Sequence, residues 1–280
     1  MSAQHADPSR FAERLRRRER LVGYWIALDN PVGTERIAAL GFDYVGVDGQ
    51  HGVTHPAGWQ AAMLAIDGMQ RSAGVIRVPF LDRALIGSAL DVGARAVIVP
   101  MVESAAEALA AVRACRHAPM GTRSYAGPVR AQLRLGTVPR DIDSQTACIV
   151  MIETRGAMDE LEAICATPGL DGVYVGPADL SIALGARFFG DEESAVPFEV
   201  ALSRVTRAAE QAGVACGIHC PDGGSAARRL SQGFTFATVS SDITHLEQTA
   251  ATHLAVSREE VPRLVVAGAP ADGALSHARR

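Results

Sequence analysis

Short runs of β-branched and other apolar residues alternate along this chain with longer, alanine-rich amphipathic stretches. Such alternation is typical of repeated strand–helix units that build a parallel sheet. We predict eight strands, at Leu21–Leu28, Tyr44–Asp48, Val75–Pro79, Ala96–Val102, Ala147–Glu153, Gly172–Gly176, Ala215–Cys220 and Phe236–Ser240. Helical patterns follow them, near Thr34–Leu40, Ala57–Arg71, Arg83–Val92, Ala105–Cys115, Ala157–Ala166, Pro197–Gln211, Gly224–Ser231 and Ile243–Ser257. Eight such units predict an α/β fold, the closed (β/α)8 TIM barrel.

The connections between the predicted elements favour the barrel over an open, doubly wound sheet. An open sheet that binds a nucleotide needs a glycine-rich phosphate turn after its first strand, and the segment 29–34, Asp-Asn-Pro-Val-Gly-Thr, is no such turn. Gly41 and Gly213 close helical patterns just before strands, which predicts left-handed caps. We therefore expect a tail and helix over 1–20, one barrel over 21–257, and an extension over 258–280 whose end is flexible.

The charge balance excludes some classes of partner. With 27 basic and 31 acidic residues the net charge is −4, so nothing favours nucleic-acid binding. The basic run Arg14–Arg20 is interpreted as the solvated face of an N-terminal helix rather than as a nucleic-acid or membrane arm. The chain has no apolar run of membrane length and its N-terminus lacks a signal-peptide core. We expect a cytoplasmic protein.

The chain has five cysteines, an odd number that cannot all pair in disulfides within one chain. Four of them lie in apolar segments that are interpreted as core. We therefore predict reduced thiols rather than a disulfide framework. Within Cys216-Gly-Ile-His-Cys220 a strand would place Cys216 and Cys220 on one side and His219 on the other, which is a poor chelating arrangement.

Ionisable groups gather where the predicted strands end, which is where barrel enzymes place their active sites. Glu153 and Asp179 end neighbouring strands, so their carboxylates can meet above the barrel and bind a hard cation such as Mg²⁺ or Mn²⁺. The alternative is that Glu153 pairs with an arginine and Asp179 caps the helix that begins near Leu180. The residue types alone leave both readings open.

Two further residues are candidates for proton transfer and charge stabilisation. His51 follows a strand and could act as a base oriented by Asp48, or it could be merely exposed. Arg77 lies inside a strand; directed into the barrel mouth it would stabilise an oxyanion, and otherwise it would neutralise Glu153 or Asp48. The chain contains no lysine, which rules out a lysine Schiff base on residue content.

These same segments resemble the HpcH/HpaI aldolase family over about 21–253. The resemblance is carried by Gly41-Phe-Asp-Tyr-Val-Gly-Val-Asp-Gly-Gln-His51, Ile76-Arg-Val-Pro79, Leu90-Asp-Val-Gly-Ala94, Met151-Ile-Glu153 and Gly172-Val-Tyr-Val-Gly-Pro-Ala-Asp-Leu-Ser181. It implies a metal-dependent (class II) aldolase that reversibly cleaves 4-hydroxy-2-oxo acids to pyruvate and an aldehyde through a metal-stabilised enolate. Mg²⁺ or Mn²⁺ is the implied cofactor, with Co²⁺ as a further candidate.

The resemblance also implies roles for individual residues. Glu153 and Asp179 match the metal ligands, Arg77 the arginine that contacts the keto oxygen and enolate, and His51 the histidine that handles the proton of the C4 hydroxyl. Asp91 matches an acidic residue that supports this histidine from a neighbouring subunit. The turn Gly176-Pro177-Ala178 looks like the one that receives the substrate carboxylate. We count Trp25, Arg123 and His219 among the expected substrate-binding residues.

Three positions depart from the family pattern: Met151 replaces a common glutamine, Gln50 replaces an acidic residue, and Ser124 replaces a glycine in the loop 119–125 that lies over the active site in the family. His219 is placed either toward the aldehyde or in ordinary packing. The resemblance further implies a homohexamer, a trimer of dimers, with the last helix swapped between subunits.

Three rival functions remain at this point. A glycoside hydrolase also uses paired carboxylates, although only 5% of the residues are aromatic. A related lyase acting on an acyl-CoA thioester would need a basic groove for the phosphates. A non-catalytic ligand-binding barrel is the third.

Overall fold

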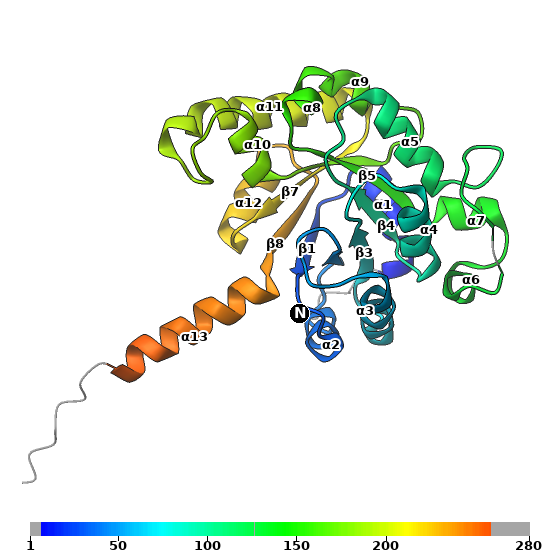
Figure 1. Ribbon diagram of the computed structural model, residues 1–280, viewed down its shortest axis with the longest axis horizontal. Helices are drawn as coiled ribbons and strands as arrows, with labels where there is room; N and C mark the ends of the chain where they lie inside the picture. The colour runs from blue at the N-terminus through cyan, green and yellow to red at the C-terminus, as the bar shows by residue number, and fades with distance from the viewer. Residues whose placement is uncertain (1–6, 126, 259–280) are drawn as a thin grey trace, which may run out of the picture. The chain divides into compact units, whose positions relative to one another are not determined.

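The computed structural model describes residues 7–125 and 127–258, and its strands form one closed, parallel barrel in the order β1 to β8 (Figure 1). This confirms the predicted TIM barrel and the number of strands. The strands are β1 (Leu21–Ile26), β2 (Tyr44–Asp48), β3 (Ala73–Arg77), β4 (Ala96–Val99), β5 (Ala147–Ile152), β6 (Gly172–Val175), β7 (Ala215–Cys220) and β8 (Phe236–Ser241).

Helices follow the strands, and those from α2 to α12 lie around the barrel (Figure 1). Their bounds are α1 (Phe11–Arg16), α2 (Pro31–Ala38), α3 (Pro56–Met69), α4 (Arg83–Asp91), α5 (Ala105–Cys115), α6 (Arg130–Leu135), α7 (Pro139–Ser144), α8 (Arg155–Asp159), α9 (Leu161–Cys165), α10 (Pro177–Ala183), α11 (Ala195–Ala212), α12 (Gly223–Ser231) and α13 (Asp242–Arg258), with 3-10 turns at Pro8–Arg10 and Glu192–Ser194.

Of the two predicted glycine caps, the one at Gly213 is present: Gly213 (φ 73°) ends α11 in the left-handed region, a conformation that costs glycine little. The prediction for Gly41 is wrong, because Ala39 caps α2 in the right-handed region, and Gly41 (φ 91°) lies in the turn before β2. The helix predicted near 157–166 is instead two helices, α8 and α9, which meet at Glu160. Helices α6 and α7 were not predicted, because each has only six residues and shows little periodicity.

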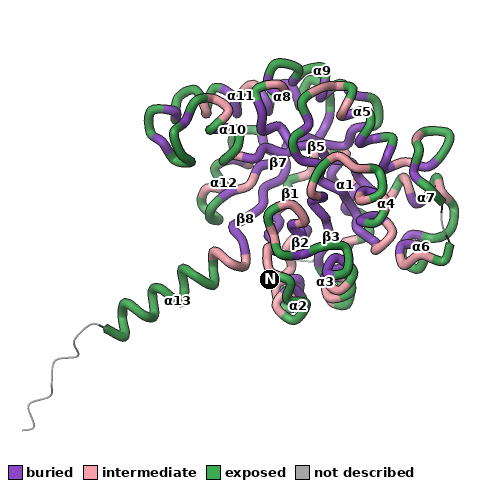
Figure 2. The backbone as a smooth tube through the Cα atoms, in the orientation of Figure 1, coloured by how far each residue is buried: buried purple, intermediate pink, exposed green. Residues whose placement is uncertain are grey.

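Two apolar layers hold the barrel together, and Figure 2 shows the strands as buried throughout most of their length. One layer lies between the outside of the sheet and the helices, and the other fills the barrel interior. Phe11, Ala12 and Leu15 of α1 belong to the interior layer, and the Phe11 ring lies 5.6 Å from that of Tyr44. Helix α1 therefore packs against the inside of the barrel.

This packing corrects the interpretation of the basic run as a solvated helix face. The helix ends at Arg16, and its arginines form specific contacts: Arg14 with Glu19 and Asp43, and Arg16 with Asp171, at 2.6–2.8 Å. Because the apolar side of α1 enters the barrel, these arginines are drawn against the carboxylates around its rim.

All five cysteines are buried, one more than the four that the sequence placed in the core, and none of them forms a disulfide among the described residues. Cys216 and Cys220 belong to the layer between sheet and helices, whereas His219 lines a pocket on the other side of β7, so the predicted alternation is confirmed. No helix among the described residues is long and apolar enough to cross a membrane.

The described residues fall into two units, one ending at His245 and the other beginning at Leu246, within α13. Every residue from 246 to 258 is exposed in this chain. The boundary of the barrel at 257 remains a prediction, and most of the predicted extension 258–280 lies outside the described residues.

Candidate active site

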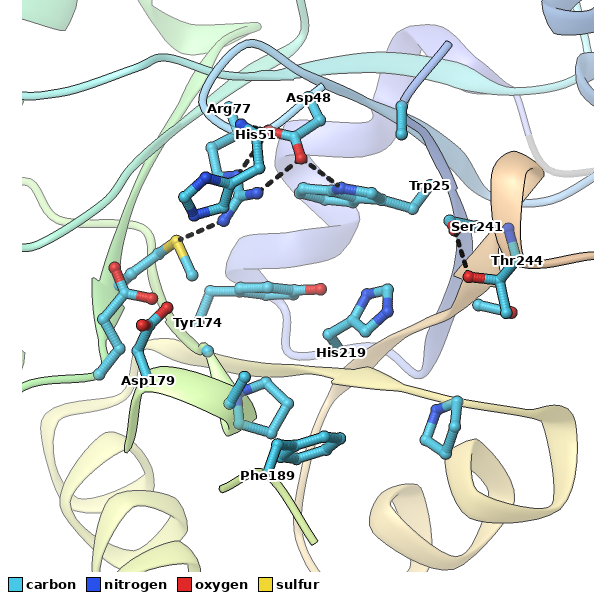
Figure 3. Close-up of a pocket in the computed structure, with 18 of the residues that line it drawn as sticks. Trp25, Asp48, His51, Arg77, Tyr174, Asp179, Phe189, His219, Ser241 and Thr244 are labelled. Atoms are coloured by element: carbon cyan, nitrogen blue, oxygen red, sulfur yellow. Dashed lines mark hydrogen bonds and ion pairs between the residues drawn. The ribbon is translucent and has the colours of Figure 1, made fainter. Parts of the chain in front are cut away.

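A pocket of about 470 Å³ opens at the carboxyl ends of the strands, the end where barrel enzymes keep their chemistry. Figure 3 shows side chains from several strands and loops that converge on it. It is lined by Trp25, Ala27, Asp48, His51, Arg77, Met151, Glu153, Tyr174, Gly176, Pro177, Ala178, Asp179, Phe189, His219, Pro221, Ser240, Ser241, Ile243 and Thr244. Nine of the eleven predicted site residues are therefore brought together here, Asp91 and Arg123 being the other two.

Arg77, at the end of β3, is buried and forms a two-pronged ion pair with Asp48 at the end of β2. Its Nε donates to Asp48 Oδ1 at 2.9 Å and its Nη2 to Oδ2 at 2.6 Å. Residues 48 and 77 are neighbours in the register of the two strands, which brings the side chains together. Burial alone would raise the pKa of Asp48, but the hydrogen bonds and charge of Arg77 outweigh it and lower that pKa.

The remaining nitrogen of this guanidinium, Nη1, has no oxygen partner among the described residues. It lies 3.9 Å from Met151 Sδ, and a thioether is only a weak acceptor. Arg77 thus combines the two roles considered from the sequence, neutralising a carboxylate and stabilising an oxyanion. Its Nε and Nη2 bind Asp48, and its Nη1 is available to a ligand.

Aromatic rings form the wall beside Arg77. The Arg77 guanidinium lies 5.2 Å from the Trp25 ring centroid, and Trp25 stacks on Tyr174 with an interplanar angle of 7°. The indole Nε1 donates to Asp48 Oδ2 at 3.2 Å. Below them, Tyr174 and Tyr44 each form a 2.7 Å hydrogen bond with the Thr238 hydroxyl. Trp25 is therefore fixed in place as part of the pocket.

Glu153 follows β5 directly and is 1% exposed. Its Oε1 accepts a hydrogen bond from the Met101 backbone N–H at 2.8 Å, and Met101 has a φ of 55°. Its Oε2 is buried and has no hydrogen-bond partner among the described residues. Burial raises the pKa of Glu153, and the nearby Asp179 carboxylate adds to this rise, whereas the Met101 N–H and Arg77 oppose it.

Gly176 makes room for this unpaired oxygen. A Cβ at position 176 would lie 2.1 Å from Glu153 Oε2 and 2.9 Å from Met151 Cε. The backbone φ of Gly176 is −87°, an ordinary value, so it is this close approach of Glu153 that requires glycine.

Asp179 is the third residue of α10 and is exposed to the pocket. The alternative that it caps the helix is wrong, because the cap position is Gly176, whose carbonyl accepts from the Leu180 N–H at 3.0 Å. Glu153 forms no ion pair with any arginine of residues 7–125 and 127–258. A buried, unpaired carboxylate oxygen beside a second carboxylate is what a hard cation neutralises, so the two residues fit a divalent metal. The described residues contain no cluster of three or more ligand side chains, so other ligands would be water or substrate.

His51 lies in the loop after β2, where it is exposed and lines the pocket next to Arg77 (Figure 3). The expectation that Asp48 orients the imidazole is wrong. Asp48 Oδ1 instead accepts from the backbone N–H groups of Gln50 and His51, at 2.9 and 3.2 Å, because the chain turns back immediately after the strand. Asp48 thus holds the backbone of His51.

His219, at the end of β7, lines the pocket edge-on to Trp25 with ring centroids 5.9 Å apart. Burial, together with the charge of Arg77, lowers the pKa of His219 to about 4. The side chain is therefore uncharged near neutral pH.

Asp91 and Arg123 lie outside the pocket of their own chain. Asp91 ends α4, and its Oδ1 accepts from Arg123 Nη2 at 2.9 Å. Arg123 is buried, and its Nε and Nη1 have no partner among the described residues. The chain as a single copy therefore gives neither residue access to the pocket described above.

Several pocket residues were not predicted from the sequence. The pocket-lining residues that were missed include Tyr174, Phe189, Ser240, Ser241, Ile243 and Thr244, and the backbone donor Met101, which binds Glu153, was missed as well. Interior aromatics, small hydroxyl residues and backbone donors carry no motif. The one available signal is Pro100, which ends a strand and precedes Met101.

Comparison with known proteins gives a consistent result. The family model "HpcH/HpaI aldolase/citrate lyase" matches residues 21–249. The chain is 34% identical over 239 residues to 5-keto-4-deoxy-D-glucarate aldolase of Citrobacter koseri (84% of this chain, 91% of the relative), and 37% identical over 228 residues to 4-hydroxy-2-oxovalerate aldolase of Rhodococcus jostii (80% and 86%). A solved HpcH/HpaI aldolase/citrate lyase family protein of Burkholderia cenocepacia has 34% identity, covers 89% of this chain and 99% of that one, and gives a TM-score of 0.83. The chain belongs to the HpcH/HpaI aldolase/citrate lyase family.

Proposed function

We propose that this protein is a divalent-metal-dependent aldolase that reversibly cleaves 4-hydroxy-2-oxo acids to pyruvate and an aldehyde. The observation that carries the proposal is the meeting, in one pocket, of the unpaired oxygen of Glu153 with the free edge of Arg77 and with His51. The named relatives, which are aldolases, support the same reaction class.

Arg77 supplies the fixed positive charge in this reaction. Cleavage of the C3–C4 bond moves the bonding electrons into C2–C3 and leaves the enolate of pyruvate, whose oxygen is negative. Nη1 of Arg77 donates to that oxygen, while Asp48 and Trp25 keep the guanidinium in place. Because Met151 does not compete strongly for Nη1, this donor is available to the substrate.

His51 moves the proton of the C4 hydroxyl. It accepts this proton as C4 becomes the aldehyde carbonyl, and it returns a proton to that oxygen in the condensation direction. The enolate then gains one proton at C3 to complete pyruvate, and His51 releases the proton that it accepted, so the turnover involves no net proton uptake. The backbone contact with Asp48 keeps the loop that carries His51 next to Arg77.

Glu153 and Asp179 would hold the cation, for which Mg²⁺, Mn²⁺ and Co²⁺ are the candidates. When bound, it supplies Lewis-acid polarisation of the 2-oxo acid. The backbone of Gly176, Pro177 and Ala178, beside Asp179, is the proposed contact for the substrate carboxylate.

Asp91 enters the proposal through a neighbouring subunit, as the family resemblance implies. Asp91 lies outside the pocket of its own chain, which is consistent with that role. Its hydrogen bond with Arg123 keeps the two side chains side by side, so both could contact a neighbouring subunit. We propose a homohexamer built as a trimer of dimers, in which the last helix, α13, is exchanged.

Pyruvate release from a panel of 4-hydroxy-2-oxo acids tests the function, with the protein treated with EDTA and then supplied with Mg²⁺, Mn²⁺ or Co²⁺. We expect turnover that EDTA abolishes and that at least one of the metals restores. Metal-independent turnover, or no pyruvate from any substrate, would contradict the proposal.

A further inference from the structure

The pocket continues beyond the groups that the proposed reaction uses. In Figure 3, Asp179 lies on one side of the pocket and Ser241 and Thr244 lie across it, with Trp25, Tyr174 and His219 between them. Because Glu153, Asp179 and Arg77 bind the 2-oxo acid portion, the aldehyde portion extends toward this opposite side, where Ser240 also lines the wall.

Ser240 occupies a position that would suit glycine. The register between β1 and β8 pairs Tyr24 with Val239 and Trp25 with Ser241, so Ser240 is the extra residue of a bulge. Its φ is 50°, in the left-handed region that glycine adopts without steric cost. Non-glycine residues held in that region cluster at ligand and active sites.

The hydroxyl of this strained residue is also unpaired. Ser240 is 2% exposed, and its Oγ has no hydrogen-bond partner among the described residues. The adjacent hydroxyls are satisfied, since Ser241 Oγ and Thr244 Oγ1 lie 2.8 Å from each other. Of the hydroxyls that the structure describes on this wall, that of Ser240 is the one without a partner, and an unpaired buried hydroxyl is costly unless a ligand supplies a partner.

Among the described residues no charged side chain lines this end of the pocket, since the nearby Asp242 binds the backbone N–H groups of Ala27 and Leu28 instead. The lining of this end consists of Ala27, Phe189, Pro221, Ser240, Ser241, Ile243 and Thr244, next to His219, which burial and the charge of Arg77 keep neutral. A neutral hydroxyl group fits this wall, whereas a second carboxylate would be buried without a counter-charge.

We propose that Ser240 is a specificity residue for the aldehyde, and that the preferred aldehyde is a short, uncharged hydroxyaldehyde whose hydroxyl pairs with Ser240 Oγ. This inference rests on the proposed aldolase function, because it assigns the part of the substrate that becomes the aldehyde.

The test uses two aldehydes that differ by one hydroxyl, glycolaldehyde and acetaldehyde, each condensed with pyruvate by the metal-loaded enzyme. The measured quantity is the ratio of kcat/KM for glycolaldehyde to that for acetaldehyde. We expect Ser240→Gly and Ser240→Ala to lower this ratio about 5- to 10-fold, the effect of one hydrogen bond. Ser240→Gly also relieves the backbone, so a reduced ratio in a variant with unchanged or higher Tm excludes misfolding as its cause.

Gln70→Gly is the matched control, since Gln70 has a φ of 53° but lies at the end of α3, outside the pocket. Its ratio should equal that of the parent protein. An unchanged ratio in both Ser240 variants would overturn the subsite while leaving the aldolase function intact. The same holds if the parent protein has a higher kcat/KM for succinic semialdehyde, which carries a carboxylate, than for glycolaldehyde. Failure of every aldehyde to condense would overturn the aldolase function itself, and the subsite with it.

Discussion

Arg77 and Asp48 form a buried ion pair with two hydrogen bonds, of 2.9 and 2.6 Å, at the mouth of the barrel. Breaking such a pair leaves a buried charge without a partner. We expect Asp48→Ala to lower the free energy of unfolding by about 3 kcal/mol and Asp48→Asn to lower it less, because the amide still accepts one hydrogen bond. Denaturant unfolding measures both. Equal losses in the two variants would contradict this, because they would show that the hydrogen bond kept by asparagine contributes nothing and that only the negative charge of Asp48 matters.

Arg77→Lys keeps the positive charge but loses the forked geometry that lets one guanidinium bind Asp48 and the substrate together. We expect kcat/KM for cleavage to fall about 100-fold, with only a small change in the affinity for the metal, measured by calorimetry. Activity close to that of the parent protein would remove Arg77 from the role of enolate stabiliser.

Gly176→Ala tests whether Glu153 needs the space above residue 176. Its new Cβ would overlap with Glu153 Oε2, so we expect the affinity for Mn²⁺ to fall about 10-fold or more, with a parallel loss of activity. Gly68→Ala in α3 is the control, because its Cβ would meet nothing within 4 Å; its stability should stay the same or rise by up to about 1 kcal/mol. Unaltered Mn²⁺ affinity in Gly176→Ala would mean that the Glu153 side chain can move away from residue 176 and still bind the metal.

The depressed pKa of His219 makes stability depend on pH. The pKa is about 4 in the folded protein, and its usual value in an unfolded chain is about 6.5. Between these values the unfolded state binds more protons, so this group lowers the free energy of unfolding as the pH falls from about 6.5 toward 4. From pH 6.5 to pH 5 its contribution is about 1 to 2 kcal/mol. Between pH 6.5 and pH 5 the free energy of unfolding of His219→Asn should therefore fall by about 1 to 2 kcal/mol less than that of the parent protein. Urea unfolding at the two pH values measures this difference. Parallel losses would show that His219 is solvated.

The proposed role of Asp91 in a neighbouring subunit can be tested by mixing two variants, His51→Ala and Asp91→Ala. Each should be nearly inactive alone, because every site in it lacks one group. After co-expression, mixed oligomers should contain some sites with an intact His51 and an intact Asp91 from different chains, and activity should return in part. Mixing His51→Ala with Arg77→Ala serves as the control. Both residues line the pocket of one chain, so no mixed oligomer of these two variants contains a site with both groups, and activity should not return. Absence of recovery for the Asp91 pair would contradict the role of the neighbour.

The fold was predictable because every strand of the barrel is a short apolar run followed by an amphipathic helix. Strand ends were less predictable: β4 stops at Val99, not Val102, because Pro100 lacks an N–H and Met101 turns into the left-handed region. Helix α10 begins at Pro177, so Asp179 is inside it rather than at its cap. Both boundaries coincide with a proline, Pro100 or Pro177, whereas the left-handed turn at Met101 has no signal in the local sequence.

The site was predictable where charges end strands. Glu153, Asp179, Arg77 and His51 all line the pocket, because each lies at or shortly after the carboxyl end of a strand. The sequence did not decide whether Arg77 forms its ion pair with Asp48 or with Glu153. The choice depends on the register between β2 and β3, which places Asp48 next to Arg77. Ser240 was missed because a bulge is a property of two strands, and nothing in the run Thr-Val-Ser-Ser distinguishes it.

The hydroxyl of Thr238, which binds the phenols of Tyr44 and Tyr174 inside the barrel, has a spectroscopic consequence. Burial raises the pKa of both phenols well above the ordinary value, so neither becomes phenolate while the barrel is closed. Two of the four tyrosines would therefore add their alkaline absorbance only when water enters the interior. The ultraviolet spectrum at high pH thus offers a label-free signal that the barrel has opened.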